Sequence, residues 1–167
     1  MSVPWSVGEV PCFYNAPVTG RPQHCNYKDI PERKSRYPFG FGLTYSNFEY
    51  GDALVEGNVA KAAVRNAGSR RATETVQLYV RQVVCHEGWR PIRELRGFRR
   101  VTLGPGESAE VSFDLNDKVL GYTDRDGRFR CDDGEYMIWI SKDSNVDGRK
   151  GAIYSFTNVL KTTPPVE

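Results

Sequence analysis

The sequence predicts an all-β protein in which two antiparallel sheets pack as a β-sandwich, preceded by an irregular proline-rich N-terminal extension. Three observations favour this fold class. From Asn47 onward, short runs of β-branched and aromatic residues alternate with turn residues. In the run 109–115, Val111, Phe113 and Leu115 share one face directly after a Pro-Gly turn. Six of the ten prolines, in contrast, precede Phe39.

The strands are expected wherever this alternation holds between turns, and no long helical pattern interrupts them. We expect strands at 48–56, 59–66, 74–84, 94–101, 107–115, 121–130, 134–141 and 152–158. The turns carry Gly or Asn, which tolerate positive φ, at 66–69, 104–106, 126–127 and 133–134. The segment 114–120 has room for one helical turn. The apolar runs 76–80 and 136–140 predict the two central strands, and Tyr136 is placed for a tyrosine-corner hydrogen bond.

Residues 1–46 differ from the rest of the chain, and we expect an extended linker or docking segment there. Proline fixes φ and removes a backbone donor, so this stretch is unsuited to a helix or an inner strand. It also carries too many large apolar rings for a freely solvated tether, so a partner should cover them. These rings belong to Trp5, Phe13, Tyr14, Tyr27, Tyr37, Phe39, Phe41 and Tyr45. The sandwich is then expected at 47–158, followed by a tail at 159–167.

Charge and hydropathy exclude several classes of partner. The formal net charge is +2, and the basic residues are scattered rather than gathered in one block, which argues against nucleic acid. No stretch is long and apolar enough to cross a bilayer, and the start has no signal-peptide pattern. We therefore expect neither a nucleic-acid nor a membrane partner, and the localisation stays open.

Cysteine and histidine spacing predicts neither a metal site nor a catalytic thiol. The chain has four cysteines without a Cys-x-x-Cys pair and two histidines. Cys85 and His86 are adjacent, so on a strand their side chains point to opposite faces. A disulfide between Cys12 and Cys25 remains open.

The acidic group at 124–135 fails as a calcium loop. Its fifth and sixth positions are Arg128 and Phe129, where such a loop needs an oxygen ligand and a glycine. A hairpin turn flanked by solvated acids is the favoured interpretation. We assign no catalytic, cofactor-binding or metal-binding residue, and we expect no cofactor.

Several ordered sequence blocks together resemble one known domain family. The chain is similar to the fibronectin type III-like (immunoglobulin-like) domain at the C-terminal end of glycoside hydrolase family 3 enzymes, the β-glucosidase and β-xylosidase group. The blocks are Val7-Gly-Glu-Val-Pro11, Tyr14-Asn15, Thr19-Gly-Arg-Pro22, Tyr37 to Tyr45, Asn66-Ala-Gly68, Val76 to Val80, Arg90 to Phe98, Leu103 to Glu107 and Gly134-Glu-Tyr136.

The resemblance implies a noncatalytic accessory domain in carbohydrate degradation. In the family, the aspartate nucleophile and usually a glutamate acid/base lie on domains that precede the matched part, so no residue here inherits either role. The chain alone is expected to be inactive, and its parent's substrate and oligomeric state stay open. We expect it to dock on the catalytic domains, in cis or in trans. The candidate docking residues are Tyr14, Asn15, Thr19, Gly20, Arg21, Pro22, Tyr37, Phe39 and Phe41.

An alternative hypothesis is an independent carbohydrate-binding or protein-interaction module. Trp89 lies in a predicted loop, where a side chain is free to touch a sugar or a partner, and is the low-ranking candidate contact. Tyr79, Tyr122 and Trp139 could join it as a stacking platform. Core or interface packing is the favoured interpretation of these rings, because aromatic side chains bury the most surface.

Overall fold

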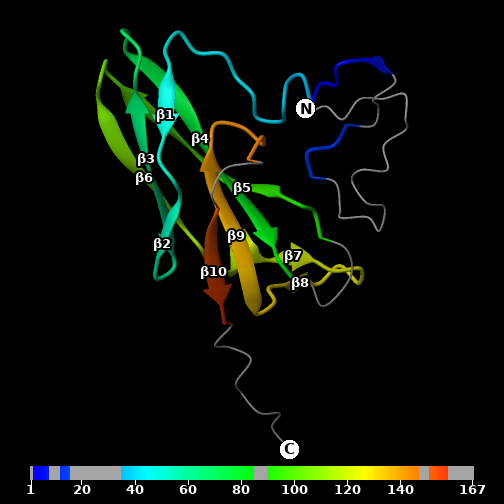
Figure 1. Ribbon diagram of the computed structural model, residues 1–167. Coiled ribbons are helices and arrows are strands. Elements are labelled where there is room, and N and C mark those ends of the chain that lie inside the picture. Colours follow the sequence, from blue (N-terminus) through cyan, green and yellow to red (C-terminus); the bar gives the residue numbers. More distant parts are fainter. Residues whose placement is uncertain (1, 8–11, 16–34, 85–89, 147–150, 158–167) are drawn as a thin grey trace, which may run out of the picture.

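The computed structural model describes residues 2–7, 12–15, 35–84, 90–146 and 151–157, and two antiparallel sheets account for most of them (Figure 1). In the first sheet, β3 (Val59–Asn66) pairs with β6 (Ser108–Asp114), β1 (Phe48–Tyr50) and β2 (Leu54–Glu56). The second sheet has the order β10-β9-β4-β5. Its strands are β4 (Ala72–Gln82), β5 (Glu94–Leu103), β9 (Gly134–Ser141) and β10 (Ala152–Phe156).

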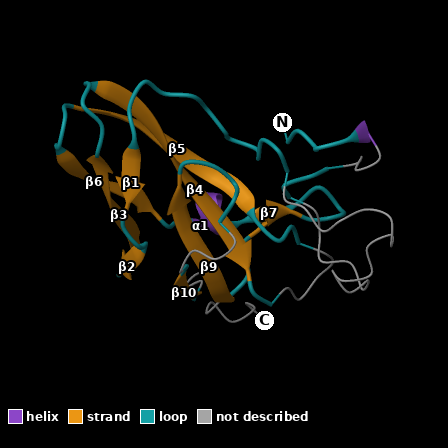
Figure 2. Ribbon diagram, turned by 45° about the horizontal axis from the view of Figure 1, so that its top comes forward, coloured by secondary structure: helices purple, strands orange, loops and turns teal. Residues whose placement is uncertain are grey.

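Two short elements complete the described fold, as Figure 2 shows. The hairpin of β7 (Tyr122–Thr123) and β8 (Phe129–Arg130) follows the helical turn α1 (Asp117–Leu120). The Asn116 side chain caps α1 by accepting a hydrogen bond from the backbone N–H of Val119 (3.1 Å). The predicted all-β fold, the helical turn and the central position of β4 and β9 are all confirmed.

The hydrophobic core lies between the two sheets. Alternate residues of β3 and β6 in the first sheet and of β4 and β9 in the second point into it. The residues that these four strands bury there are Ala60, Ala62, Val64, Val76, Leu78, Val80, Val111, Phe113, Tyr136, Ile138 and Ile140. Each large apolar side chain removed from water contributes about 1.5–3 kcal/mol, so this layer is the main source of stability.

Two of the expected strands are wrong as single elements. The range 48–56 divides into β1 and β2, because the inward-facing residues change phase between Tyr50 and Ala53. The range 121–130 forms the β7–β8 hairpin instead of one strand. There the Asp124 carboxylate accepts the backbone N–H groups of Asp126 (3.0 Å) and Arg128 (2.8 Å), and Gly127 has φ +78°.

A buried asparagine joins three loops at one end of the sandwich. Asn66 is fully buried, and its amide nitrogen donates to the carbonyl oxygens of Arg70 (2.8 Å) and Leu103 (2.9 Å). Its amide oxygen accepts from the Ser46 hydroxyl (2.5 Å) and the backbone N–H of Gly68 (3.0 Å). The predicted Asn-Ala-Gly turn is therefore a structural node.

The tyrosine corner is also present. The Tyr136 hydroxyl donates to the carbonyl oxygen of Asp132 (2.7 Å), four residues upstream. Burial raises the pKa of Tyr136 well above its usual value, which keeps this donor protonated. Its role is structural.

Candidate functional site

The outer face of the second sheet carries several large apolar side chains among polar ones. Because Gln77 and Tyr79 face outward on β4, the residues paired with them on the neighbouring strands share that face. An antiparallel sheet with one solvated face normally places polar residues there. The large apolar residues on this outer face are Tyr79, Leu95, Phe98, Met137, Trp139 and Ile153. Phe98 and Ile153 are 65% and 63% exposed, so part of this face lies open.

The N-terminal segment packs on another part of this face. We call its described residues, 2–7, 12–15 and 35–45, the arm. The Tyr14 ring stacks on Phe39, with centroids 4.0 Å apart, and meets the Tyr79 ring edge-on at 6.3 Å. Tyr79 is consequently 0% exposed although it points away from the core. Burial raises the pKa of its phenol well above the usual value.

Polar contacts fix the arm at Gly40. Gln77 Nε2 donates to the carbonyl oxygens of Gly40 (3.0 Å) and Lys142 (2.5 Å), and the Tyr79 hydroxyl donates to Gln77 Oε1 (2.7 Å). The backbone N–H of Ser144 donates to the Phe39 carbonyl (2.9 Å). Gly40 has φ +81°, and a Cβ there would clash with Gln77 Oε1, so the position requires glycine.

Tyr14 is held by the start of β5. Arg93 Nε donates to the Tyr14 carbonyl oxygen (3.1 Å), and the backbone N–H of Leu95 donates to the Tyr14 hydroxyl (3.4 Å). Further along the arm, Val3 and Tyr37 exchange two backbone hydrogen bonds (2.8 and 3.3 Å). The arm is thus attached to the sheet through both ring packing and backbone bonds.

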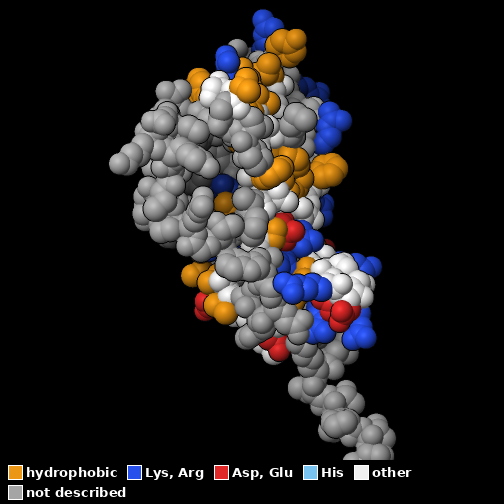
Figure 3. All heavy atoms as spheres, turned by 90° about the vertical axis from the view of Figure 1, so that its right-hand side faces the viewer, with side chains coloured by type: hydrophobic (Ala, Val, Ile, Leu, Met, Phe, Trp, Pro, Cys, Tyr) orange, Lys and Arg blue, Asp and Glu red, His pale blue; other side chains and the backbone are white. Residues whose placement is uncertain are grey.

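Other arm rings remain exposed and form an aromatic patch, which we define as Trp5, Tyr37 and Phe41. The Tyr37 and Phe41 rings lie 5.0 Å apart, and the Arg36 guanidinium lies over both Trp5 (5.6 Å) and Tyr37 (5.7 Å). Figure 3 shows one side of the molecule, on which hydrophobic side chains form separate patches among basic groups. The arm therefore keeps apolar surface available after packing on its own sheet.

The candidate docking residues have different surroundings. Tyr14 and Phe39 face the sheet, whereas Asn15, Tyr37 and Phe41 are exposed. Residues 19–22 and Trp89 lie outside the described residues. The docking role of the set stays a prediction.

Two rings of the predicted stacking platform are covered. Tyr79 lies beneath the arm, and the Arg90 guanidinium lies 4.2 Å above the ring centroid of Tyr122. The Tyr122 hydroxyl also donates to the Asp132 carboxylate (2.9 Å). Trp139 is half-buried. The platform interpretation is therefore wrong for Tyr79 and Tyr122, because both rings are occupied by contacts within the chain.

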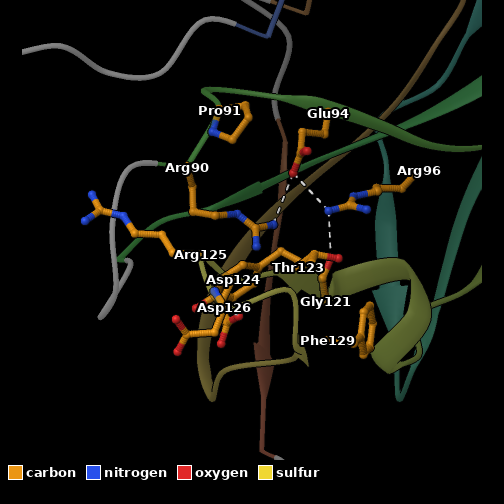
Figure 4. Close-up of a pocket in the computed structure, with 11 residues that line it drawn as sticks. Arg90, Pro91, Glu94, Arg96, Gly121, Thr123, Asp124, Arg125, Asp126 and Phe129 are labelled. Carbon is orange, nitrogen blue, oxygen red and sulfur yellow. Dashed lines mark hydrogen bonds and ion pairs between the residues drawn. The ribbon is translucent and has the colours of Figure 1, made fainter.

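A cavity that the sequence analysis missed lies between the start of β5 and the β7–β8 hairpin (Figure 4). It has a volume of about 720 Å³, and arginine and acidic side chains reach it from both elements. A β-bulge at Leu78/Tyr79 leaves Arg96 without a partner in the β4–β5 register. Its side chain then donates to the Gly121 carbonyl oxygen (2.7 Å) beside the cavity.

Ion pairs hold the charged walls of this cavity. Glu94 Oε2 accepts from Arg90 Nη2 (3.1 Å) and Arg96 Nη2 (3.0 Å), and these side chains are largely buried. On the hairpin, Asp124 Oδ2 pairs with Arg130 Nε (2.6 Å). Hydrogen bonds from the Arg128 backbone and from Arg130 hold the pKa of Asp124 below its usual value.

The described part of the chain was compared with the geometry of metal sites and of reactive thiols. No group of three or more His, Cys, Asp or Glu side chains there is arranged to hold a metal ion. Cys12 is a free thiol beside the Ser35 hydroxyl (3.4 Å), and Cys25 lies outside the described residues. Burial raises the pKa of the Cys131 thiol, which keeps it in its unreactive form. None of the described helices has the length and hydropathy of a membrane span.

Sheet order, core and tyrosine corner define a β-sandwich domain of the fibronectin type III-like class, and the family model described as "Fibronectin type III-like domain" matches residues 74–144. The chain contains a fibronectin type III-like domain that matches the C-terminal part of family 3 β-glucosidases and β-xylosidases. The predicted family and fold are both confirmed.

Three relatives illustrate the match. A putative β-xylosidase from Formosa agariphila is 34% identical over 161 residues, which cover 90% of this chain and 20% of that protein. The structure of a β-glucosidase from Erythrobacter marinus is 34% identical with a TM-score of 0.81, covering 92% of this chain and 21% of that one. A family 3 β-glucosidase structure from Bifidobacterium adolescentis is 27% identical with a TM-score of 0.70, covering 100% of this chain and 27% of that one.

The chain thus spans about a fifth of the length of the first two of these relatives. This share is consistent with one part of a multidomain glycosidase.

Proposed function

We propose that this chain is a noncatalytic accessory domain of a family 3 glycosidase, and that it docks on the catalytic part through the arm and the outer face of the second sheet. The observation that carries the proposal is the apolar surface that remains after the arm has packed. Phe98, Ile153 and the aromatic patch leave large side chains in water, and exposed apolar areas of this kind mark interaction sites. The chain matches about a fifth of the length of two glycosidases, so the remaining part of such an enzyme is the proposed docking partner.

The acidic residues that line the cavity support a noncatalytic role for it. A retaining glycosidase needs a general acid whose pKa is raised and a second carboxylate free to act as nucleophile. Neither role fits the cavity carboxylates Asp124 and Glu94, because Asp124 is paired with Arg130 and has a lowered pKa, and Glu94 is shared by two arginines. These carboxylates stabilise the local structure.

The Erythrobacter marinus β-glucosidase provides a host for the test, since this chain covers 21% of it at 34% identity. One compares the host without its matched segment with a chimera in which this chain replaces that segment. We expect the chimera to recover thermal stability and hydrolysis of an aryl β-glucoside that the truncated host loses. The isolated chain should show no turnover.

Surface substitutions show whether the proposed face makes the contact. Phe98→Lys and Ile153→Lys should lower the stability of the chimera but leave the isolated chain nearly unchanged, because both residues are solvent-exposed in the chain alone. Leu54→Lys is the matched control, since Leu54 is 62% exposed on the outer face of the opposite sheet. If all three variants behave alike in the chimera, docking through this face is wrong.

A further inference from the structure

On the β5 side of the cavity two guanidinium groups meet one carboxylate, although the charged residues lining the whole cavity balance: Arg90, Arg96 and Arg125 against Glu94, Asp124 and Asp126. Arg90 and Arg96 share the single carboxylate of Glu94, which leaves one positive charge over on that wall. The Asp124 charge on the opposite wall is matched by Arg130. At the rim, the exposed side chains of Arg125 and Asp126 have opposite charges and offset each other.

Two buried N–H donors at this wall also lack acceptors. Nη1 of Arg90 and Nε of Arg96 have no hydrogen-bond partner among the described residues, and the Arg90 side chain is 8% exposed. A buried unpaired donor is costly, and more so when it carries charge. Both arginines line the cavity.

The two arginines are already held in place before any ligand arrives. Arg90 is fixed between Glu94 and the Tyr122 ring, and Arg96 is fixed between Glu94 and the Gly121 carbonyl oxygen. Figure 4 shows both side chains pointing from the β5 side toward the hairpin. Preorganised guanidinium groups lose little side-chain entropy when they bind an anion.

We propose that this cavity is a carboxylate-binding site, in which the ligand carboxylate accepts hydrogen bonds from Arg90 and Arg96. One carboxylate supplies the single negative charge and the acceptor oxygens that the wall lacks, and it suits the planar guanidinium fork. Pro91 and the exposed ring of Phe129 also line the cavity, and its volume of about 720 Å³ admits a ring-sized body beside the carboxylate. This site is independent of the proposed docking role.

Two sources can supply such a carboxylate: a free organic acid, or an acidic side chain from another part of a parent protein. Three probes separate them when the whole chain is titrated: D-glucuronate, acetate and D-glucose. The Nε–H signals of Arg90 and Arg96 in ¹⁵N NMR spectra report binding. We expect saturable shifts with glucuronate and no shift with glucose. Glucuronate binding tighter than acetate indicates a ring-bearing acid, and equal binding indicates an acidic side chain.

Variants locate the binding. Arg96→Lys keeps the charge but removes the Nε donor, and it should weaken glucuronate binding about tenfold. Phe129→Ala should weaken glucuronate but not acetate if the ring body is recognised. Arg65→Gln, an exposed arginine on β3, is the control and should change nothing. Absence of saturation with both acids, equal shifts with glucose, or an unchanged affinity in Arg96→Lys overturns the proposal.

Discussion

Gly40→Ala tests whether the arm is locked onto the sheet through Gln77 and Tyr79. Gly40 has φ +81°, where an L residue is strained, and the new Cβ would clash with Gln77 Oε1 and lie 2.8 Å from the Tyr79 hydroxyl. The substitution therefore acts twice. It strains the backbone and displaces the side chain that holds the arm.

The magnitude follows from these two effects. Placing alanine in the left-handed region costs about 1–2 kcal/mol. Displacing Gln77 breaks its bond to the Gly40 carbonyl and the bond from Tyr79, at about 1 kcal/mol each. We expect a total of about 3–4 kcal/mol, most of it lost from attachment of the arm rather than from the sandwich core.

Two glycines of the same chain serve as matched controls. Gly57 also has positive φ (+59°), but a Cβ added there would meet no atom within 4 Å, so Gly57→Ala should lose only the backbone share of about 1–2 kcal/mol. Gly42 lies in the arm with neither feature, and Gly42→Ala should be nearly neutral. Hydrogen exchange at the Ser144 amide, which donates to the Phe39 carbonyl oxygen of the arm, reports arm release, and denaturant unfolding reports global stability.

The reasoning is refuted if Gly40→Ala and Gly57→Ala lose equal stability while the Ser144 amide stays protected. That result would mean that the Gln77 contact contributes nothing and that ring packing alone holds the arm. The expected pattern is faster exchange at the Ser144 amide in Gly40→Ala, with a larger loss of stability than in Gly57→Ala.

Three further predictions concern the sandwich. Asn66→Ala should lower the free energy of unfolding by about 3–5 kcal/mol, because four hydrogen bonds of a buried side chain are lost. The control Asn58→Ala, at an exposed position, should change the free energy of unfolding little. Similar denaturant midpoints for the two variants would contradict this prediction. Tyr79 and Tyr136 should resist ionisation in an absorbance titration. Since their folded pKa values lie above the unfolded value of about 10, their contribution to stability is complete below pH 10 and declines as the pH rises further. Titration of all nine tyrosines at about pH 10 in the folded protein would refute this prediction. Leu78→Ala should cost about 2–5 kcal/mol in urea unfolding, and a smaller loss would show that the core relaxes around the site.

Much of the sandwich could be predicted because burial of one sheet face imposes a period of two on the sequence. The bounds of β3 and β9 agree with the expected ranges, and β4 and β9 lie at the centre as their apolar runs indicated. The prediction failed where the period changes. Between Tyr50 and Ala53 the inward phase shifts by one residue, and at 124–128 an aspartate binds backbone N–H groups and reverses the chain.

The candidate docking surface was only partly predictable. The proline and aromatic content of residues 1–46 distinguishes this segment from the rest of the chain, and strand alternation places Tyr79 opposite the core residues. Alternation cannot show what covers an outward residue, because that depends on contacts between distant segments. Tyr14 and Phe39 contact Tyr79 from 65 and 40 positions away along the sequence, and the residue pattern within each segment does not predict this contact.

The cavity depends on such distant contacts even more strongly. Sequence alternation treats β5 as a regular strand, in which Glu94 and Arg96 share a face and present an ordinary solvated ion pair. The bulge at Leu78/Tyr79 changes that arrangement and brings Arg96 against Gly121, 25 residues further along the chain. One carboxylate then serves two partly buried guanidinium groups, and a ligand carboxylate would supply a second acceptor for them. The Glu94–Arg96 pair would contribute little to stability on a solvated strand face, whereas in the partly enclosed cavity its unpaired donor favours binding of an anion.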